Sequence, residues 1–196
     1  MKHQKTAQLG RNRHVMGWKL KKTVVLVGMM GAGKTAVGKA LAARLDVPFL
    51  DSDAEIEKAA ARTIPEIFAR DGEPFFRLKE SQVIERLLDG NHGILSTGGG
   101  AWMSERNRTA ISGRGVAVWL DADLQLLWQR VRHKDSRPLL RTPDPLGTLR
   151  ALFEARVPVY ALADLQVKVK PRYTIEQTAD QVLAALLTRP DVLEAT

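Results

Sequence analysis

Short apolar runs rich in β-branched residues alternate along the chain with longer segments whose apolar positions recur at helical spacing. The first run, residues 23–27, is typical of a strand buried on both faces of a parallel sheet. Residues 36–45 follow it with the spacing of a helix. The same patterns predict strands over 47–50, 93–96, 116–120 and 166–169, and helices over 53–61, 64–71, 74–88, 123–132, 146–163 with an interruption at Pro158, and 175–188.

This alternation of strands and helices predicts an α/β fold. Short strands joined by helices form a parallel sheet through right-handed crossovers, which place helices on both faces. The five predicted strands therefore indicate a parallel five-stranded sheet. In such a sheet ligands bind beyond the carboxyl ends of the strands.

The segment between the first strand and the first helix is a glycine loop, Gly28-Met-Met-Gly-Ala-Gly-Lys34-Thr35. It is a complete Walker A pattern in the context of strand, loop and helix that the motif requires. Its glycines let backbone amides surround an anion, and the start of the helix adds unpaired N–H groups. Lys34 supplies a point charge for phosphates, and the Thr35 hydroxyl can bind Mg²⁺. The alternative is a glycine-rich turn with a surface lysine.

The positive charge of the chain is concentrated at its N-terminus. The net charge is +8, of which residues 1–22 contribute +7 because they contain seven lysines and arginines and no acid. We predict that residues 1–22 form a basic, disordered extension and that residues 23–196 form the domain. The nearly neutral domain does not favour a nucleic-acid partner.

The composition excludes several other classes of protein. The chain has no cysteine, so it has neither disulfides nor thiolate metal sites. No stretch approaches the roughly 20 apolar residues of a membrane span, and the basic N-terminus lacks the apolar centre of a secretory signal. A guanine-recognition motif of the form Asn-Lys-x-Asp is also absent, which argues against a GTP-dependent switch.

Two acids follow the second predicted strand and come close to the phosphate loop. Asp51 ends that strand and suits a metal, because Mg²⁺ prefers oxygen ligands and keeps several waters. Asp53, two residues later, suits an attacking hydroxyl, which it could orient or deprotonate. The alternative is that both acids only cap helices.

Three arginines far apart in the sequence are further candidates. Arg77, Arg137 and Arg156 stand in the segments Phe76-Arg77, Arg137-Pro138 and Arg156-Val157-Pro158. A guanidinium matches a carboxylate with two parallel hydrogen bonds, so the arginines suggest an anionic acceptor. Each could instead be a solvated surface residue.

Over residues 23–190 the chain resembles the shikimate kinases. The resemblance is carried, in order and spacing, by the phosphate loop, Asp51-Ser-Asp53, Glu55-Ile-Glu57, Phe68, Gly72-Glu73, Phe76-Arg77, Glu80, Gly98-Gly99-Gly100-Ala101, Arg137-Pro-Leu-Leu and Arg156-Val-Pro-Val-Tyr160. It implies a P-loop, nucleoside-monophosphate-kinase-like three-layer sandwich and a mobile lid over about 131–145. The implied reaction transfers the γ-phosphate of ATP to the 3-hydroxyl of shikimate, a step of chorismate and aromatic amino acid biosynthesis.

The resemblance also implies roles for individual residues. Catalysis would fall to Lys34, Asp53 and Arg137. The nucleotide would be bound by Gly31, Ala32, Gly33, Lys34, Thr35, Ala36, Arg130 and Arg137, and Mg²⁺ by Thr35 and Asp51. Shikimate would be bound by Asp53, Phe76, Arg77, Glu80, Gly98, Gly99, Gly100 and Arg156. Asp121, which ends an apolar strand, is expected to lie away from the metal.

The nearest alternative is another small-molecule P-loop kinase such as gluconate kinase. It would share the fold and the phosphate loop but not the full set of arginines or the triple glycine. We further expect a cytoplasmic monomer without nucleic-acid or membrane partners. A nucleotide-binding turn near 171–174 carries no residue that the sequence can assign to a contact.

Overall fold

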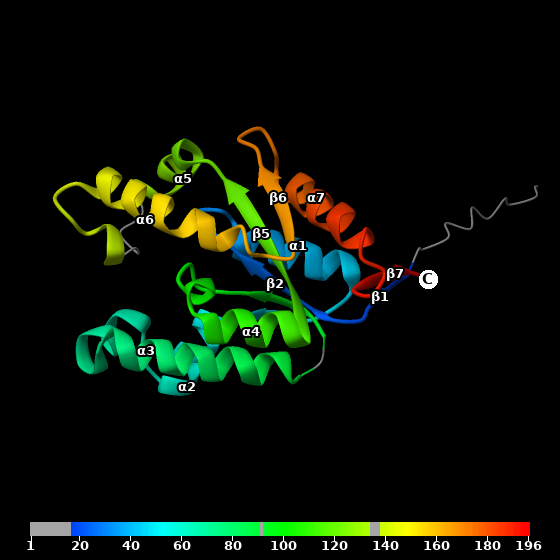
Figure 1. The fold of residues 1–196 in the computed structure, drawn as a ribbon, viewed down its shortest axis with the longest axis horizontal. Helices are drawn as coiled ribbons and strands as arrows, with labels where there is room; N and C mark the ends of the chain where they lie inside the picture. Colours follow the sequence, from blue (N-terminus) through cyan, green and yellow to red (C-terminus); the bar gives the residue numbers. More distant parts are fainter. Residues whose placement is uncertain (1–16, 91, 134–137) are drawn as a thin grey trace, which may run out of the picture.

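The computed structural model describes residues 17–90, 92–133 and 138–196. Its centre is a five-stranded parallel sheet in the order β3-β4-β2-β5-β6, which confirms the predicted fold class (Figure 1). The strands are β3 Phe49–Asp51, β4 Ile94–Ser96, β2 Thr23–Val27, β5 Gly115–Ala122 and β6 Leu165–Val169. Strands β2 and β5 are buried throughout, as strands covered on both faces must be.

Helices cover both faces of this sheet. In Figure 1, α1 and α7 lie together on one side of the sheet, and α4 and α6 lie on the other. The helices are α1 Lys34–Leu45, α2 Ser52–Ala60, α3 Ile64–Leu88, α4 Glu105–Arg114, α5 Leu124–Val131, α6 Pro145–Tyr160 and α7 Ile175–Leu187, with short 3-10 helices η1 Ala101–Met103 and η2 Pro138–Leu140. None of the helices in the described part of the chain is long and apolar enough to cross a membrane.

Helix α3 begins and bends where the sequence predicts. Thr63 and Glu66 form a reciprocal capping box, with Thr63 N 2.8 Å from a Glu66 carboxylate oxygen. Gly72 interrupts the helix with φ 79° and ψ 168°, a conformation that residues other than glycine rarely adopt. Helix α2 and both parts of α3 contribute to a small second core of Ile56, Ile67 and Phe76, apart from the main core.

Two features of the fold differ from the sequence predictions. Helix α6 is not interrupted at Pro158 but continues to Tyr160. Because Pro158 lies in the last turn, its missing N–H removes a single hydrogen bond and the helix needs no break. Helix α4 is absent from the predictions, since its polar segment gives little apolar periodicity.

The expected disordered extension over residues 1–22 is wrong for its last part. Trp18–Leu20 form β1, which pairs antiparallel with β7, Leu193–Ala195, near the other end of the chain. Lys21 and Lys22 make ion pairs of 2.9 and 2.8 Å with Glu194 and Asp191. Three-residue strands carry no periodic signal, and this pairing joins residues that the sequence separates widely. Residues 1–16 lie outside the described residues.

The close pairing of β2 and β5 generates a stability prediction. A Cβ atom on Gly115 would lie 2.6 Å from the Thr23 carbonyl oxygen, whereas one on Gly113 in α4 would have no atom within 4 Å. Gly115→Ala is expected to lower the free energy of unfolding by about 1–3 kcal/mol, because it pushes two central strands apart. The control Gly113→Ala is expected to leave it unchanged or raise it by up to about 1 kcal/mol. Urea unfolding measures both, and equal effects would contradict the prediction.

Candidate active site

The phosphate loop joins the end of β2 to the start of α1. Gly28, Gly31 and Gly33 have φ of 141°, 85° and 99°, values that favour glycine. Lys34 Nζ donates to the carbonyl oxygens of Gly28 and Met29 at 2.7 and 3.1 Å, which holds the side chain across the loop. The loop therefore has the backbone conformation of an anion cradle at a helix N-terminus.

A cavity of about 580 Å³ opens over this loop. Arg130 borders it and donates to the carbonyl oxygens of Gly31 and Ala32 at 3.1 and 3.3 Å, and burial lowers the pKa of this arginine. At the far end the cavity is lined by Val169, Tyr173, Thr174, Ile175 and Thr178. The sequence assigned none of these five residues, because the turn before α7 has no motif.

Beside Lys34, three oxygen-bearing side chains meet. Thr35 Oγ1 lies 3.2 Å from Asp51 Oδ2 and 3.3 Å from Ser96 Oγ. The other oxygen of Asp51 caps α2 by accepting from the backbone N–H groups of Asp53 and Ala54. Asp51 thus has the structural role of a helix cap and also presents an oxygen to the phosphate loop. One carboxylate and two hydroxyls suit Mg²⁺, which keeps water in its remaining positions.

The Walker B-like residue Asp121 has other partners. Strand β5 lies directly beside β2, but the Asp121 carboxylate accepts from Gln166 Nε2 at 2.5 Å and makes an ion pair with Lys168. Both partners belong to β6, on the side of β5 away from β2. No group of three or more acidic, histidine or cysteine side chains in the described residues could hold a metal, so a metal site here depends on hydroxyl oxygens as well.

A second cavity of about 530 Å³ adjoins the first, and four residues line both of them: Met30, Asp53, Gly98 and Gly99. Asp53 therefore stands at the junction of the phosphate loop cavity and the second cavity. The second cavity is also lined by Phe76, Arg77, Glu80, Gly100 and Arg156, as well as by Glu57, Ile64, Pro65, Phe68, Leu139 and Arg141. The last six of these residues were not predicted as contacts from the sequence.

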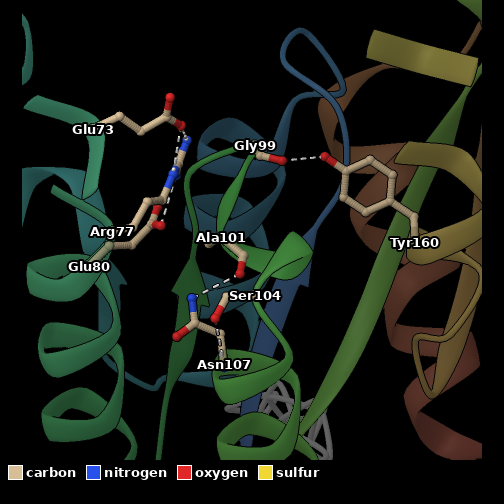
Figure 2. A network of polar contacts seen from close by, with 8 residues as sticks. All are labelled: Glu73, Arg77, Glu80, Gly99, Ala101, Ser104, Asn107 and Tyr160. Atoms are coloured by element: carbon tan, nitrogen blue, oxygen red, sulfur yellow. Dashed lines mark hydrogen bonds and ion pairs between the residues drawn. The ribbon is translucent and has the colours of Figure 1, made fainter. Parts of the chain in front are cut away.

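The walls of the second cavity carry buried charges. Arg77 donates to Glu73 and Glu80 at 3.1 and 2.8 Å, and its guanidinium lies 5.1 Å from the centre of the Phe76 ring (Figure 2). Burial raises the pKa of Glu80, and the neighbouring Arg77 offsets this only in part. Glu80 Oε1 and Arg156 Nη1 are both buried without a hydrogen-bond partner among the described residues. Such buried polar atoms indicate a polar ligand.

The triple glycine lines this cavity for a steric reason. Unlike the glycines of the phosphate loop, Gly98, Gly99 and Gly100 do not have positive φ. A Cβ on Gly98 would lie 2.8 Å from Asp53 Oδ1, and one on Gly100 would lie 2.7 Å from the Arg77 guanidinium. A side chain at Gly98 or Gly100 would therefore displace the charged group of Asp53 or Arg77 from its present position.

The structure brings together nearly all the predicted site residues. Those of the nucleotide and metal sets line the first cavity, and those of the acceptor set line the second. Arg137 and the lid residues 134–136 lie outside the described residues. Tyr160 belongs to the segment Arg156-Val-Pro-Val-Tyr160, yet no role was predicted for it.

A Walker A loop on one cavity and two arginines on the adjoining cavity are features of a P-loop kinase that acts on small anionic molecules. The family model described as "Shikimate kinase" matches residues 30–187. The shikimate kinases of Cereibacter sphaeroides and Ruegeria pomeroyi are each 69% identical to the chain, over 93% and 89% of it and 90% of either relative. The chain belongs to the shikimate kinase family.

Solved structures agree with this assignment. The shikimate kinase from Acinetobacter baumannii, solved in complex with shikimate, has a TM-score of 0.81 and 38% identity over 85% of this chain and 93% of that chain. A gluconokinase from Sinorhizobium meliloti has a TM-score of 0.58 and 18% identity over 87% and 94%. The latter shares only the fold, so the gluconate alternative has little support.

Proposed function

We propose that this kinase transfers the γ-phosphoryl group of ATP to the 3-hydroxyl of shikimate, giving shikimate 3-phosphate and ADP. One observation carries the proposal for this site: the phosphate loop cavity and the charged second cavity share Asp53 and Met30 at their junction. A phosphoryl group that leaves the first cavity therefore meets a hydroxyl held in the second. The family membership supports shikimate as the owner of that hydroxyl.

The nucleotide phosphates bind to the loop amides of residues 31–36 and to Lys34. Arg130, which contacts the phosphate loop, and the residues around the turn before α7 line the same cavity, and the adenine would bind between them. Thr35 and Asp51, with Ser96 beside them, would hold Mg²⁺, directly or through water. A bound Mg²⁺ would neutralise charge on the β- and γ-phosphates.

The acceptor binds with its carboxylate toward Arg77 and Arg156 and its reacting hydroxyl toward Asp53. Glu80 already pairs with Arg77, so the buried Arg156 Nη1 supplies a donor that the described residues leave for a ligand. Asp53 orients the hydroxyl and accepts its proton as the oxygen–phosphorus bond forms. Phe76 forms an apolar wall beside the carbon ring of the acceptor. Catalysis by these residues is mainly positioning and charge stabilisation.

Other expectations remain predictions. Arg137 is expected to contact the transferred phosphate from a mobile lid. The monomeric state, the cytoplasmic location and the absence of nucleic-acid and membrane partners also stay predictions.

A substrate panel tests the proposed function. The full chain is incubated with ATP and Mg²⁺ plus shikimate or gluconate, and ADP formation is followed. We expect rapid ADP formation with shikimate and only background formation with gluconate, because the chain belongs to the shikimate kinase family and shares only its fold with the gluconokinase. Phosphorus NMR of the product identifies the phosphorylated hydroxyl. Turnover of gluconate in preference to shikimate would reject the proposal.

Replacing Asp53 separates catalysis from nucleotide binding. Asp53→Asn keeps the shape of the side chain but removes the base, so kcat is expected to fall by about 10²-fold or more. ATP affinity, measured by calorimetry, should stay within about twofold. The exposed Asp71→Asn serves as the matched control and should keep full turnover. Normal shikimate turnover by Asp53→Asn would exclude the role of Asp53.

Replacing Arg77 tests the acceptor clamp. Arg77→Ala removes a charge-assisted contact worth about 1.5–3 kcal/mol, so the shikimate KM is expected to rise about 10- to 100-fold. The ATP KM should change little. Arg70→Ala, on the same helix but not on this cavity, is the control. A parallel loss of affinity for both substrates would argue against the clamp.

A further inference from the structure

Tyr160 is fully buried at the end of α6, and its hydroxyl donates a hydrogen bond to the carbonyl oxygen of Gly99 (Figure 2). Its ring stacks against Trp119 with ring centres 6.1 Å apart. Burial raises the pKa of Tyr160 to about 12, although the charge of the Arg156 guanidinium and its hydrogen bond with the hydroxyl oppose the shift, so the hydroxyl keeps its proton. Tyr160 is therefore a fixed hydrogen-bond donor to the segment of Gly98, Gly99 and Gly100.

Residues 98–101 form a β-turn, and Gly99 is its second residue. Ala101 N donates to Gly98 O at 3.1 Å, which closes a four-residue turn. Gly100 has φ −93° and ψ −13°, the values of the third residue of a type I turn. In a type II turn the peptide between the second and third residues is turned over, and glycine at the third position allows it. The Gly99–Gly100 peptide can therefore adopt either orientation at low cost.

Both ends of this turn are fixed by other contacts. On one side, Thr97 Oγ1 donates to the Leu26 carbonyl oxygen at 3.0 Å. On the other, Asn107 Nδ2 donates to the Ala101 carbonyl oxygen at 2.8 Å, and Ser104 Oγ accepts from Asn107 N (Figure 2). The central peptide is thus the part of the turn whose orientation these contacts leave undetermined.

The contact with Tyr160 selects one orientation. In a planar trans peptide the C=O and N–H groups point in opposite directions. Because the Gly99 C=O faces Tyr160, the Gly100 N–H faces the other side of the loop, where Arg77 lies (Figure 2). A Cβ on Gly100 would lie 2.7 Å from the Arg77 guanidinium, which places this side of the loop at the acceptor cavity.

We propose that Tyr160 is a positioning residue for the acceptor, which holds the Gly99–Gly100 peptide with its N–H toward the acceptor carboxylate. The turned-over peptide would instead present the Gly99 carbonyl oxygen to that carboxylate and repel it. Tyr160 stands four residues after Arg156, on the same face of α6, so one helix end sets both the arginine and the peptide. This inference rests on the proposed function.

The test compares Tyr160→Phe with Trp102→Phe in the full chain. Tyr160→Phe removes only the hydroxyl. Trp102 Nε1 donates to the Val159 carbonyl oxygen at 2.9 Å, so Trp102→Phe removes a buried aromatic hydrogen bond to the same helix end but leaves the Tyr160 hydroxyl and its partner Gly99 unaltered. Shikimate KM, ATP KM and Tm are measured for both variants and for the unaltered chain.

Tyr160→Phe is expected to raise the shikimate KM about five- to tenfold, the effect of one lost hydrogen bond, with the ATP KM within twofold. Trp102→Phe is expected to lower Tm while the shikimate KM stays within twofold. An unchanged shikimate KM in Tyr160→Phe, or an equal rise in both variants, would overturn the inference while leaving the proposed function intact. No shikimate turnover by the unaltered chain would reject the proposed function itself, and this inference with it.

Discussion

The parallel pairing of β2 with its neighbours is the constraint on which the site depends. Leu26 pairs with Ser96 and Ser96 with Asp51, so three strands end at one level. The phosphate loop, the glycine turn and the start of α2 must then meet at one edge of the sheet. Segments far apart in the sequence thus form a single site through backbone register alone, before any side-chain contact contributes.

The chain uses glycine in this site for two different physical reasons. In the phosphate loop, Gly28, Gly31 and Gly33 supply positive φ so that the backbone can curve around an anion. In the turn after β4, Gly98 and Gly100 have ordinary φ and instead leave space for Asp53 and Arg77. The first group shapes the backbone around a ligand, and the second lets the backbone approach charged side chains that bind a ligand.

The acceptor cavity balances buried charges of both signs. Glu80 partly neutralises Arg77, and its own raised pKa reflects the cost of its burial. Arg156 lies on the same cavity, so the anionic acceptor that we propose would complete the charge pairing rather than enter a neutral pocket. Fold alone does not specify an acceptor, so any preference of the site must come from side chains such as these and not from the sheet.

The sequence by itself determined the alternation of strands and helices, the phosphate loop and many of the residues that line the two cavities. These features depend on local residue types and spacing, which the chain displays directly. Only the tertiary structure decided the β1–β7 pairing, the partners of Asp121, the lining of the nucleotide cavity before α7 and the contact of Tyr160 with Gly99. Each of these joins residues distant in sequence, and their proximity follows from sheet order and helix packing, which no local pattern encodes.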